Sequence, residues 1–312
     1  MKTFSATDAA ISGFRLVSEH PKAVGAWVIV STIVSAIVAV ITIGLFGSDL
    51  EAFAALSQNS SADPTETLQA MSKMGWFFLF SLVYSLVFYS VLLTAIYRVV
   101  LRPQDSKQVY LRLGADELRQ IGVSILLVVL LLAIYFGLAV VLGLTVAIVA
   151  VAAKPAAALM GIVMLCGGVC TLIYVATRLS LANVLTFATG KIDIFGSWRL
   201  TKGRFWPMFG AYFVATVLFF VVYVLLALFV TLLGGALSGF DLESLGQLMQ
   251  TQTTTLDALL TPIGVLSLAV GGLMAVLTSV TIYTPSAAIY REIATLDAEA
   301  PAPAAPSGPF DV

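Results

Sequence analysis

The chain has 312 residues, of which 60% are hydrophobic and 11% charged, and its mean hydropathy is +1.02. Because soluble domains carry about 25% charged residues, this composition excludes a soluble globular protein and indicates a polytopic membrane protein. The net charge of −1 gives no reason to expect nucleic acid as a partner.

Six long runs without any charged residue follow one another along the chain. Each is longer than the roughly 20 residues that cross a ~30 Å hydrocarbon core as a helix. Because a backbone in lipid must satisfy its own hydrogen bonds, and the runs show no strand-like alternation, we expect an all-α fold with six transmembrane helices. The runs are Ala23–Ser48, Met74–Tyr97, Gln120–Ala153, Pro155–Thr177, Phe205–Phe240 and Ala258–Tyr290.

The basic residues are distributed unevenly between the two predicted sides of the membrane. Fourteen of the sixteen fall in residues 1–22, 98–119, 178–204 and 291–312, and only Lys73 and Lys154 fall on the other side. The positive-inside rule therefore places both termini in the cytoplasm. We expect a multi-pass protein of a bacterial inner membrane, with outer loops near 49–73 and 241–257 and a very tight outer turn at Lys154-Pro155.

A short motif repeats where apolar runs end. Ala95–Arg98 (AIYR) recurs as Ala288–Arg291, and Arg178 closes the fourth run in a looser version. The chain therefore predicts three hairpins of the same orientation, 22–98, 120–178 and 205–291, related by a pseudo-rotation axis along the membrane normal. We treat residues 1–295 as one membrane domain and expect the Ala/Pro-rich cytoplasmic tail, 296–312, to be disordered.

Each hairpin is predicted to begin with a short cytoplasmic segment at the membrane interface. In the first, Ser5 is placed to cap a helix in which Ile11, Phe14 and Val17 share one face. In the second, Asp116 and Glu117 suit the positive end of the helix dipole where the third spanning helix begins. In the third, apolar and aromatic side chains cluster on one side: Ile194, Phe195 and Trp198.

The sequence shows no pattern typical of a catalytic or metal site. His20, the only histidine, lies beside Glu19 at the cytoplasmic boundary, and we interpret it as an interfacial polar residue rather than a general base. Cys166 and Cys170 share a helix face, but no further ligands accompany them in the apolar runs. We therefore expect no enzymatic activity, no cofactor and no metal. The apolar runs also lack ionisable groups, which disfavours a proton-coupled carrier.

The arginines that end the apolar runs are the most specific candidates for a binding site. If the hairpins are related by symmetry, Arg98, Arg178 and Arg291 stand at one depth on the cytoplasmic side. Together with other basic residues they could bind lipid phosphates, which suit the planar donor fork of arginine. The alternative is that they only fix the topology and extend to the interface. The other headgroup candidates are Arg112, Arg199, Lys202 and Arg204.

The six-helix layout and three segments together resemble a known family. The segments are YLRLGADELRQ (110–120), SWRLTKGRFWPMFG (197–210) and AAIYRE (287–292). Over about residues 5–292 the chain resembles the uncharacterised bacterial multipass proteins related to the membrane domain that is fused to glycerophosphoryl diester phosphodiesterases. The fused hydrolase domain has no counterpart here, so the resemblance implies a membrane module without phosphodiesterase activity, and it supplies no catalytic residues.

These observations predict a non-enzymatic membrane protein that organises lipids or partner proteins through its basic cytoplasmic face. The expected partners are membrane lipids, anionic lipids included, and the sequence leaves homo- and hetero-oligomers open. The alternative is a transporter or channel for a neutral, apolar or zwitterionic solute, and a membrane enzyme acting on lipids ranks below both. A transport cavity would need lining groups such as Ser85, Thr94, Tyr135, Thr177, Asn183 or Thr278.

Overall fold

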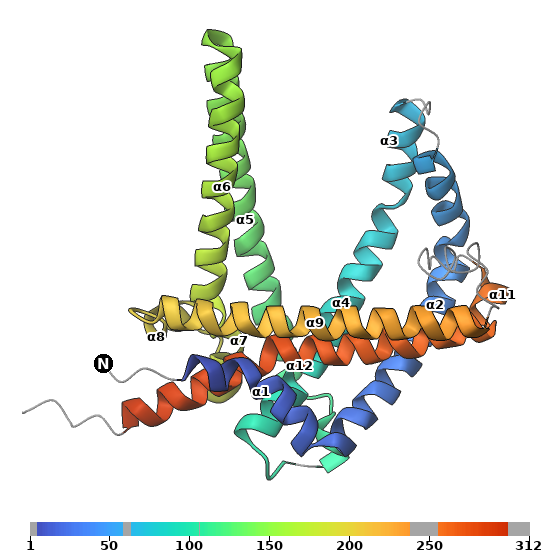
Figure 1. Cartoon of the computed structure of the whole chain (residues 1–312), viewed down its shortest axis with the longest axis vertical. Coiled ribbons are helices and arrows are strands. Elements are labelled where there is room, and N and C mark those ends of the chain that lie inside the picture. Colours follow the sequence, from blue (N-terminus) through green and yellow to red (C-terminus); the bar gives the residue numbers. More distant parts are fainter. Residues whose placement is uncertain (1–4, 59–63, 106, 238–254, 299–312) are drawn as a thin grey trace, which may run out of the picture.

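The computed structural model describes residues 5–58, 64–105, 107–237 and 255–298 (Figure 1). All regular structure within these residues is helical. The helices are α1 (Ala6–Glu19), α2 (Pro21–Gln58), α3 (Pro64–Lys73), α4 (Gly75–Leu101), the 3-10 helix η1 (Lys107–Tyr110), α5 (Ala115–Ala152), α6 (Lys154–Leu179), α7 (Ala182–Thr189), α8 (Ile194–Leu200), α9 (Phe205–Leu237), α11 (Leu256–Leu259) and α12 (Pro262–Ala298).

Six of the helices in the described part of the chain are long and apolar enough to cross a membrane, namely α2, α4, α5, α6, α9 and α12. The protein is therefore an all-α polytopic membrane protein, as the apolar runs predict. Two details differ from the expectation. Helix α2 continues beyond Ser48 to Gln58, and the segment expected as an outer loop holds the separate helix α3.

The ends of several helices follow directly from local sequence. Ser5 caps α1, and its side chain accepts a hydrogen bond from the backbone N–H of Asp8 at 3.3 Å. A single residue, Ala153, separates α5 from α6, and Pro155 stands in the first turn of α6, where proline is well tolerated. The tight turn expected at Lys154-Pro155 is thus present.

Buried side chains gather at one end of the spanning helices rather than along them. The largest buried cluster joins α1, the start of α2, the last turns of α4, α7, the start of α9 and the C-terminal half of α12. We call this region, together with η1, α8 and the adjoining ends of α5 and α6, the base. Trp27, Ile96 and Leu181 are completely buried there. The base corresponds to the side predicted to be cytoplasmic.

Helix α12 packs against α1, α2, α4 and α9 and so ties the base together. Helix α1 approaches it through small residues: a Cβ added at Gly13 would lie 3.1 Å from the Cα of Thr281. The buried side chains of α1 are Ala9, Ala10 and Leu16. The face expected to lie in the interface, with Ile11, Phe14 and Val17, is only partly buried.

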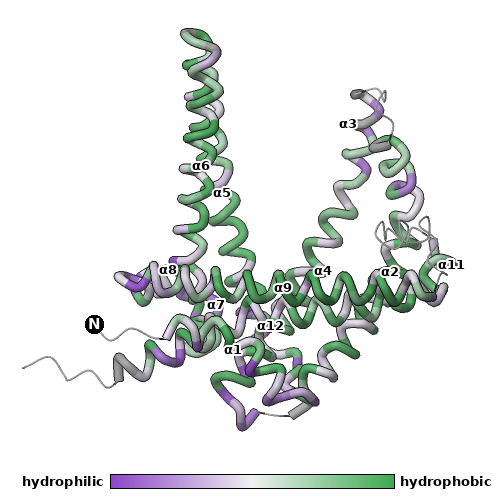
Figure 2. The backbone as a smooth tube through the Cα atoms, in the orientation of Figure 1, coloured by the Kyte–Doolittle hydropathy of each residue, from purple (hydrophilic) through white to green (hydrophobic). Residues whose placement is uncertain are grey.

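Away from the base the helices diverge. In Figure 1 the α5–α6 hairpin and the α2–α4 pair extend away from α9 and α12, which run side by side. Figure 2 shows that α5, α6 and α9 are predominantly hydrophobic (green) along their lengths. Side chains far along the α5–α6 hairpin are exposed, for example Val151 at 91% and Ile148 at 71%. These surfaces suit contact with lipid hydrocarbon.

Most of the tail predicted to be disordered, residues 299–312, lies outside the described residues. Helix α12 does continue through Ala298, which makes residues 296–298 helical.

Candidate functional site

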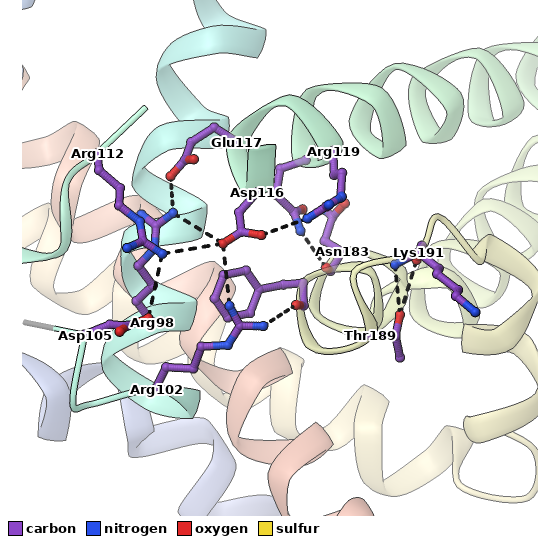
Figure 3. Close-up of polar contacts among 12 residues, drawn as sticks. Arg98, Arg102, Asp105, Arg112, Asp116, Glu117, Arg119, Asn183, Thr189 and Lys191 are labelled. Carbon is purple, nitrogen blue, oxygen red and sulfur yellow. Dashed lines mark hydrogen bonds and ion pairs between the residues drawn. The ribbon is translucent and has the colours of Figure 1, made fainter. Parts of the chain in front are cut away.

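The base holds a buried ion pair between two spanning helices. Arg98, in the last turn of α4, donates a hydrogen bond from Nη2 to Glu117 Oε1 in the first turn of α5. The Arg98 and Glu117 side chains are 1% and 2% exposed. Nη1 of Arg98 also donates to the carbonyl of Tyr110 at 2.9 Å. Arg98 therefore joins α4, α5 and the loop between them (Figure 3).

Asp116 lies beside this pair and is approached by four arginines. Its carboxylate is 3.1 Å from Arg119 Nη1, 3.5 Å from Arg102 Nη1, and 3.7 Å from both Arg98 Nη2 and Arg112 Nη2. The side chains of Arg102, Arg112 and Arg119 are 34%, 43% and 41% exposed, against 17% for Asp116. Arg112 also contacts Asp105 at 3.7 Å, and Arg98 pairs with Glu117, so three carboxylates face four arginines and the cluster keeps a small, partly exposed excess of positive charge (Figure 3).

The loop that closes this cluster adopts an uncommon backbone conformation. Val109 and Tyr110 have φ values of 55° and 65°, a region that costs most L-residues about 1–2 kcal/mol. Two hydrogen bonds to the loop offset this conformational cost. Trp27 Nε1 donates to the Val109 carbonyl at 2.8 Å, and Arg98 donates to the carbonyl of Tyr110. The loop is held from both α2 and α4.

Helix α7 links the cluster to the rest of the base. Arg102 donates to the carbonyl of Phe187 at 3.1 Å, and its guanidinium lies 4.5 Å from the centroid of the Phe187 ring. Gln120 of α5 donates to the carbonyl of Asn183 at 2.9 Å. Sequence reasoning did not single out Arg102, Arg119 or Gln120. The spacing of Arg119, three residues after Asp116, was the available signal for that pair.

The three arginines that end the apolar runs occupy unlike environments. Arg98 is buried in the ion pair. Arg178 is 5% exposed, its guanidinium lies 4.8 Å from the centroid of the Trp198 ring, and its Nε is buried without a hydrogen-bond partner. Arg291 is exposed and lines a small pocket of about 120 Å³ between α1 and α12. A common role in headgroup binding and the threefold repeat both stay predictions.

Glu19 and His20 line that same small pocket with Asp8 and Arg15, whereas Asp116 and Glu117 belong to the arginine cluster. A membrane enzyme acting on lipids would need such acids to converge with Glu19 and His20, but Asp116 and Glu117 are instead engaged with arginines. Among the residues that the structure describes, no three His, Cys, Asp or Glu side chains are grouped to hold a metal ion.

The remaining basic candidates lie around α8 and the start of α9. Arg199 pairs with Asp193 at 3.0 Å, yet its side chain is 79% exposed. Lys202 is exposed, and Arg204 Nη1 donates to the carbonyl of Leu200 at 3.1 Å. Arg112, described above, completes the predicted set. Large aromatic side chains stand beside these cations, with Phe195 and Trp206 72% and 76% exposed.

A separate cavity of about 930 Å³ lies between the α5–α6 hairpin and the helices α9 and α12. Of the groups expected to line a transport cavity, Thr177 and Asn183 line this one. Thr94 is instead buried and donates to the carbonyl of Ser90, Ser85 donates to that of Leu82, and Tyr135 is 52% exposed.

Comparison of the chain with protein-family models, with curated proteins and with solved structures found no match. The resemblance to the diesterase-linked membrane proteins therefore remains a prediction from the sequence segments.

Proposed function

We propose that this integral membrane protein binds the headgroups of anionic phospholipids through its base, at the cytoplasmic surface of a bacterial inner membrane. Through this contact it would organise lipids or partner proteins, without catalysing a reaction. The observation that carries the proposal is an exposed group on α8, the start of α9 and the turn between them, which we call the basic-aromatic surface. It consists of Phe195, Trp198, Arg199, Lys202 and Trp206.

The chemistry of this surface suits the interfacial region of a bilayer. Tryptophan and phenylalanine insert between headgroups and acyl chains, and exposed cations attract anionic lipids by about 1 kcal/mol per basic residue. The surface adjoins the N-terminal end of α9, a spanning helix, so it stands where the interface begins. The arginine cluster around Asp116 adds the partly exposed cations Arg102, Arg112 and Arg119 on the same base.

The first prediction concerns orientation. In a variant whose Cys166 and Cys170 are replaced by alanine, a cysteine introduced at Gln252 should react in intact cells with a membrane-impermeant maleimide. A cysteine introduced at Lys191, an exposed position between α7 and α8, should react only after the cells are permeabilised, because the positive-inside rule places it in the cytoplasm. The reverse labelling pattern would overturn the orientation.

The second prediction concerns lipid retention. The double variant Arg199→Gln/Lys202→Gln should co-purify with about tenfold less phosphatidylglycerol, relative to a zwitterionic lipid, because two interfacial cations are lost. Native mass spectrometry of the protein released from mild detergent gives the bound lipids directly. The matched control is Lys73→Gln/Lys154→Gln, which removes two cations from the opposite predicted side. Equal retention by the two double variants would count against headgroup binding.

Transport of a neutral or apolar small solute is the second candidate, and the cavity of about 930 Å³ is the observation in its favour. All of the lining residues, however, lie in the halves of the helices nearest the base, from Leu127 and Leu131 on α5 to Phe219 on α9. A lining confined to one half of the spanning helices supports a binding site better than it supports a path across the membrane.

A further inference from the structure

The cavity between the α5–α6 hairpin and the helices α9 and α12 has the size of a ligand site. Its volume of about 930 Å³ lies within the roughly 300–1,000 Å³ that is typical of sites for small organic molecules and cofactors. Such a volume exceeds what a few ordered waters need, since one water occupies about 30 Å³.

One part of the lining carries polar groups that are not charged. Tyr212 donates a hydrogen bond from its hydroxyl to Ser180 Oγ at 2.9 Å, and the hydroxyls of Tyr97 and Ser286 lie 3.2 Å apart. Asn183 Oδ1 is buried without any hydrogen-bond partner. Asn183 belongs to the cavity lining, so a rotation of its side-chain amide would bring this unpaired acceptor to a hydroxyl or amide donor of a ligand.

The rest of the lining is apolar, and no charged side chain belongs to it among the described residues. A phosphate or an ammonium group placed there would lose its hydration without gaining a counter-charge, which is costly in a medium of low dielectric constant. A hydroxyl or an ester carbonyl would lose little, because the hydroxyls and the amide can hydrogen-bond with it. The lining thus favours a ligand with an uncharged polar end.

In a bilayer the cavity would open toward lipid, because most of its lining belongs to spanning helices. Several of its apolar side chains stand on spanning helices and are exposed, including Phe213 at 60%, Ile282 at 52% and Ile173 at 42%. In a membrane such side chains contact hydrocarbon. A ligand that enters past these side chains must therefore be soluble in the bilayer, which favours an acyl-chain lipid over a water-soluble solute.

We propose that this cavity binds a neutral glycerolipid with a free hydroxyl, of the diacylglycerol type. The hydroxyl lies near Asn183 and the Tyr212–Ser180 pair, and an acyl chain lies against apolar walls such as Leu131 and Phe213. The site uses none of the residues of the basic-aromatic surface, so it stands independently of the proposed binding of anionic headgroups.

The test uses two lipid probes that carry the same photoreactive diazirine acyl chain, a diacylglycerol and a phosphatidylcholine. Each is incorporated into nanodiscs that hold the full-length protein, and the crosslinked residues are mapped by mass spectrometry after irradiation. We expect the diacylglycerol probe to label Leu131, Phe213 or other lining residues at least fivefold more than the phosphatidylcholine probe does.

Two variants and one control test whether the labelling occurs inside the cavity. Thr216→Trp places a large side chain at a lining position that is exposed and can accommodate it, and should abolish labelling of the cavity by diacylglycerol. Asn183→Leu removes the unpaired acceptor at similar size and should lower this labelling about fivefold. Val217→Trp, at the next position on α9, is outside the lining and 46% exposed, and should leave the labelling unchanged.

The proposal is overturned if both probes label the lining equally, because the site would then not select an uncharged end. It is also overturned if Thr216→Trp and Val217→Trp are labelled to the same extent as the unmodified protein. Thermal unfolding of both tryptophan variants in detergent verifies that they remain folded while the labelling is compared.

Discussion

Replacing Arg98 by methionine should lower the free energy of unfolding by about 3–5 kcal/mol, the usual result when one partner of a buried ion pair is removed. The change leaves the Glu117 carboxylate, whose side chain is 2% exposed, without its bonded guanidinium. It also removes the donor to the Tyr110 carbonyl, whose residue already adopts a positive φ. Detergent-solubilised protein unfolded by SDS titration, or followed by its thermal midpoint, provides the measurement.

The matched control is Arg119→Met. Arg119 contacts Asp116 at 3.1 Å, but its side chain is 41% exposed, so solvent screens the pair and the expected loss is under about 1 kcal/mol. If the two substitutions destabilised the protein equally, burial of the Arg98–Glu117 pair would not be the source of its effect.

A double variant separates the pair from the space it fills. Arg98→Met/Glu117→Leu should recover most of the lost stability, because both desolvated charges disappear together. The native pair also leaves Arg98 Nε and Glu117 Oε2 buried without hydrogen-bond partners, so its polar groups are incompletely satisfied. Recovery would indicate that the pair is retained to define how α4 meets α5, rather than to add stability.

The sequence was sufficient to predict the spanning helices, because length and apolarity alone decide whether a helix can cross a bilayer. Each of the six predicted runs contains a long helix, although the sixth run begins in the short helix α11 and α12 starts only at Pro262. The Ser5 cap and the turn at Lys154-Pro155 are present because they depend on local backbone chemistry. The extent of α2 and the presence of α3 were not predicted, since polar outer segments carry a weaker helical signal.

The packing faces could not be predicted from the apolar runs. In water a helix shows its buried face as an apolar stripe, but in lipid the outward face is apolar too. Nothing in the pattern therefore distinguished Ala287, which is buried, from Ile282, which is 52% exposed. The same loss of contrast concealed the cavity, whose lining comes from helices distant in the sequence.

The burial of Arg98, at the end of α4, is a second feature that could not be predicted from the sequence. The repeat motif placed Arg98 and Arg291 as equivalents, yet one is completely buried and the other exposed. Arg98 pairs with Glu117 of the following hairpin, a contact that the four-residue motif does not contain. Asp116 and Glu117 do lie in the first turn of α5, as the helix dipole predicts. Their ion pairs with arginines of other segments depend on tertiary structure, which the sequence pattern does not contain.

Substituting Gly272 by alanine should destabilise the protein by about 1–3 kcal/mol through overpacking. A Cβ at this position would lie 2.8 Å from the backbone N and 2.9 Å from the Cα of Thr32, and closer still to its Oγ1. The obstacle is the backbone of α2, which cannot rotate aside as a side chain can, so α12 and α2 must separate. Small residues of this kind allow membrane helices to approach closely.

The neighbouring glycine provides the control for this effect. A Cβ at Gly271 would meet no atom within 4 Å beyond its chain neighbours and the adjoining backbone of α12, and alanine is a better helix former than glycine by up to about 1 kcal/mol. Gly271→Ala should therefore leave stability unchanged or raise it, and thermal unfolding of the two variants in the same detergent compares them directly.

Helix α12 also contributes Thr281, Ile282 and Ser286 to the cavity. A shift of α12 in the Gly272→Ala variant should therefore reduce the labelling of the cavity by the diacylglycerol probe. Equal stability of the two variants would contradict the close approach of α12 to the backbone of α2 at Gly272.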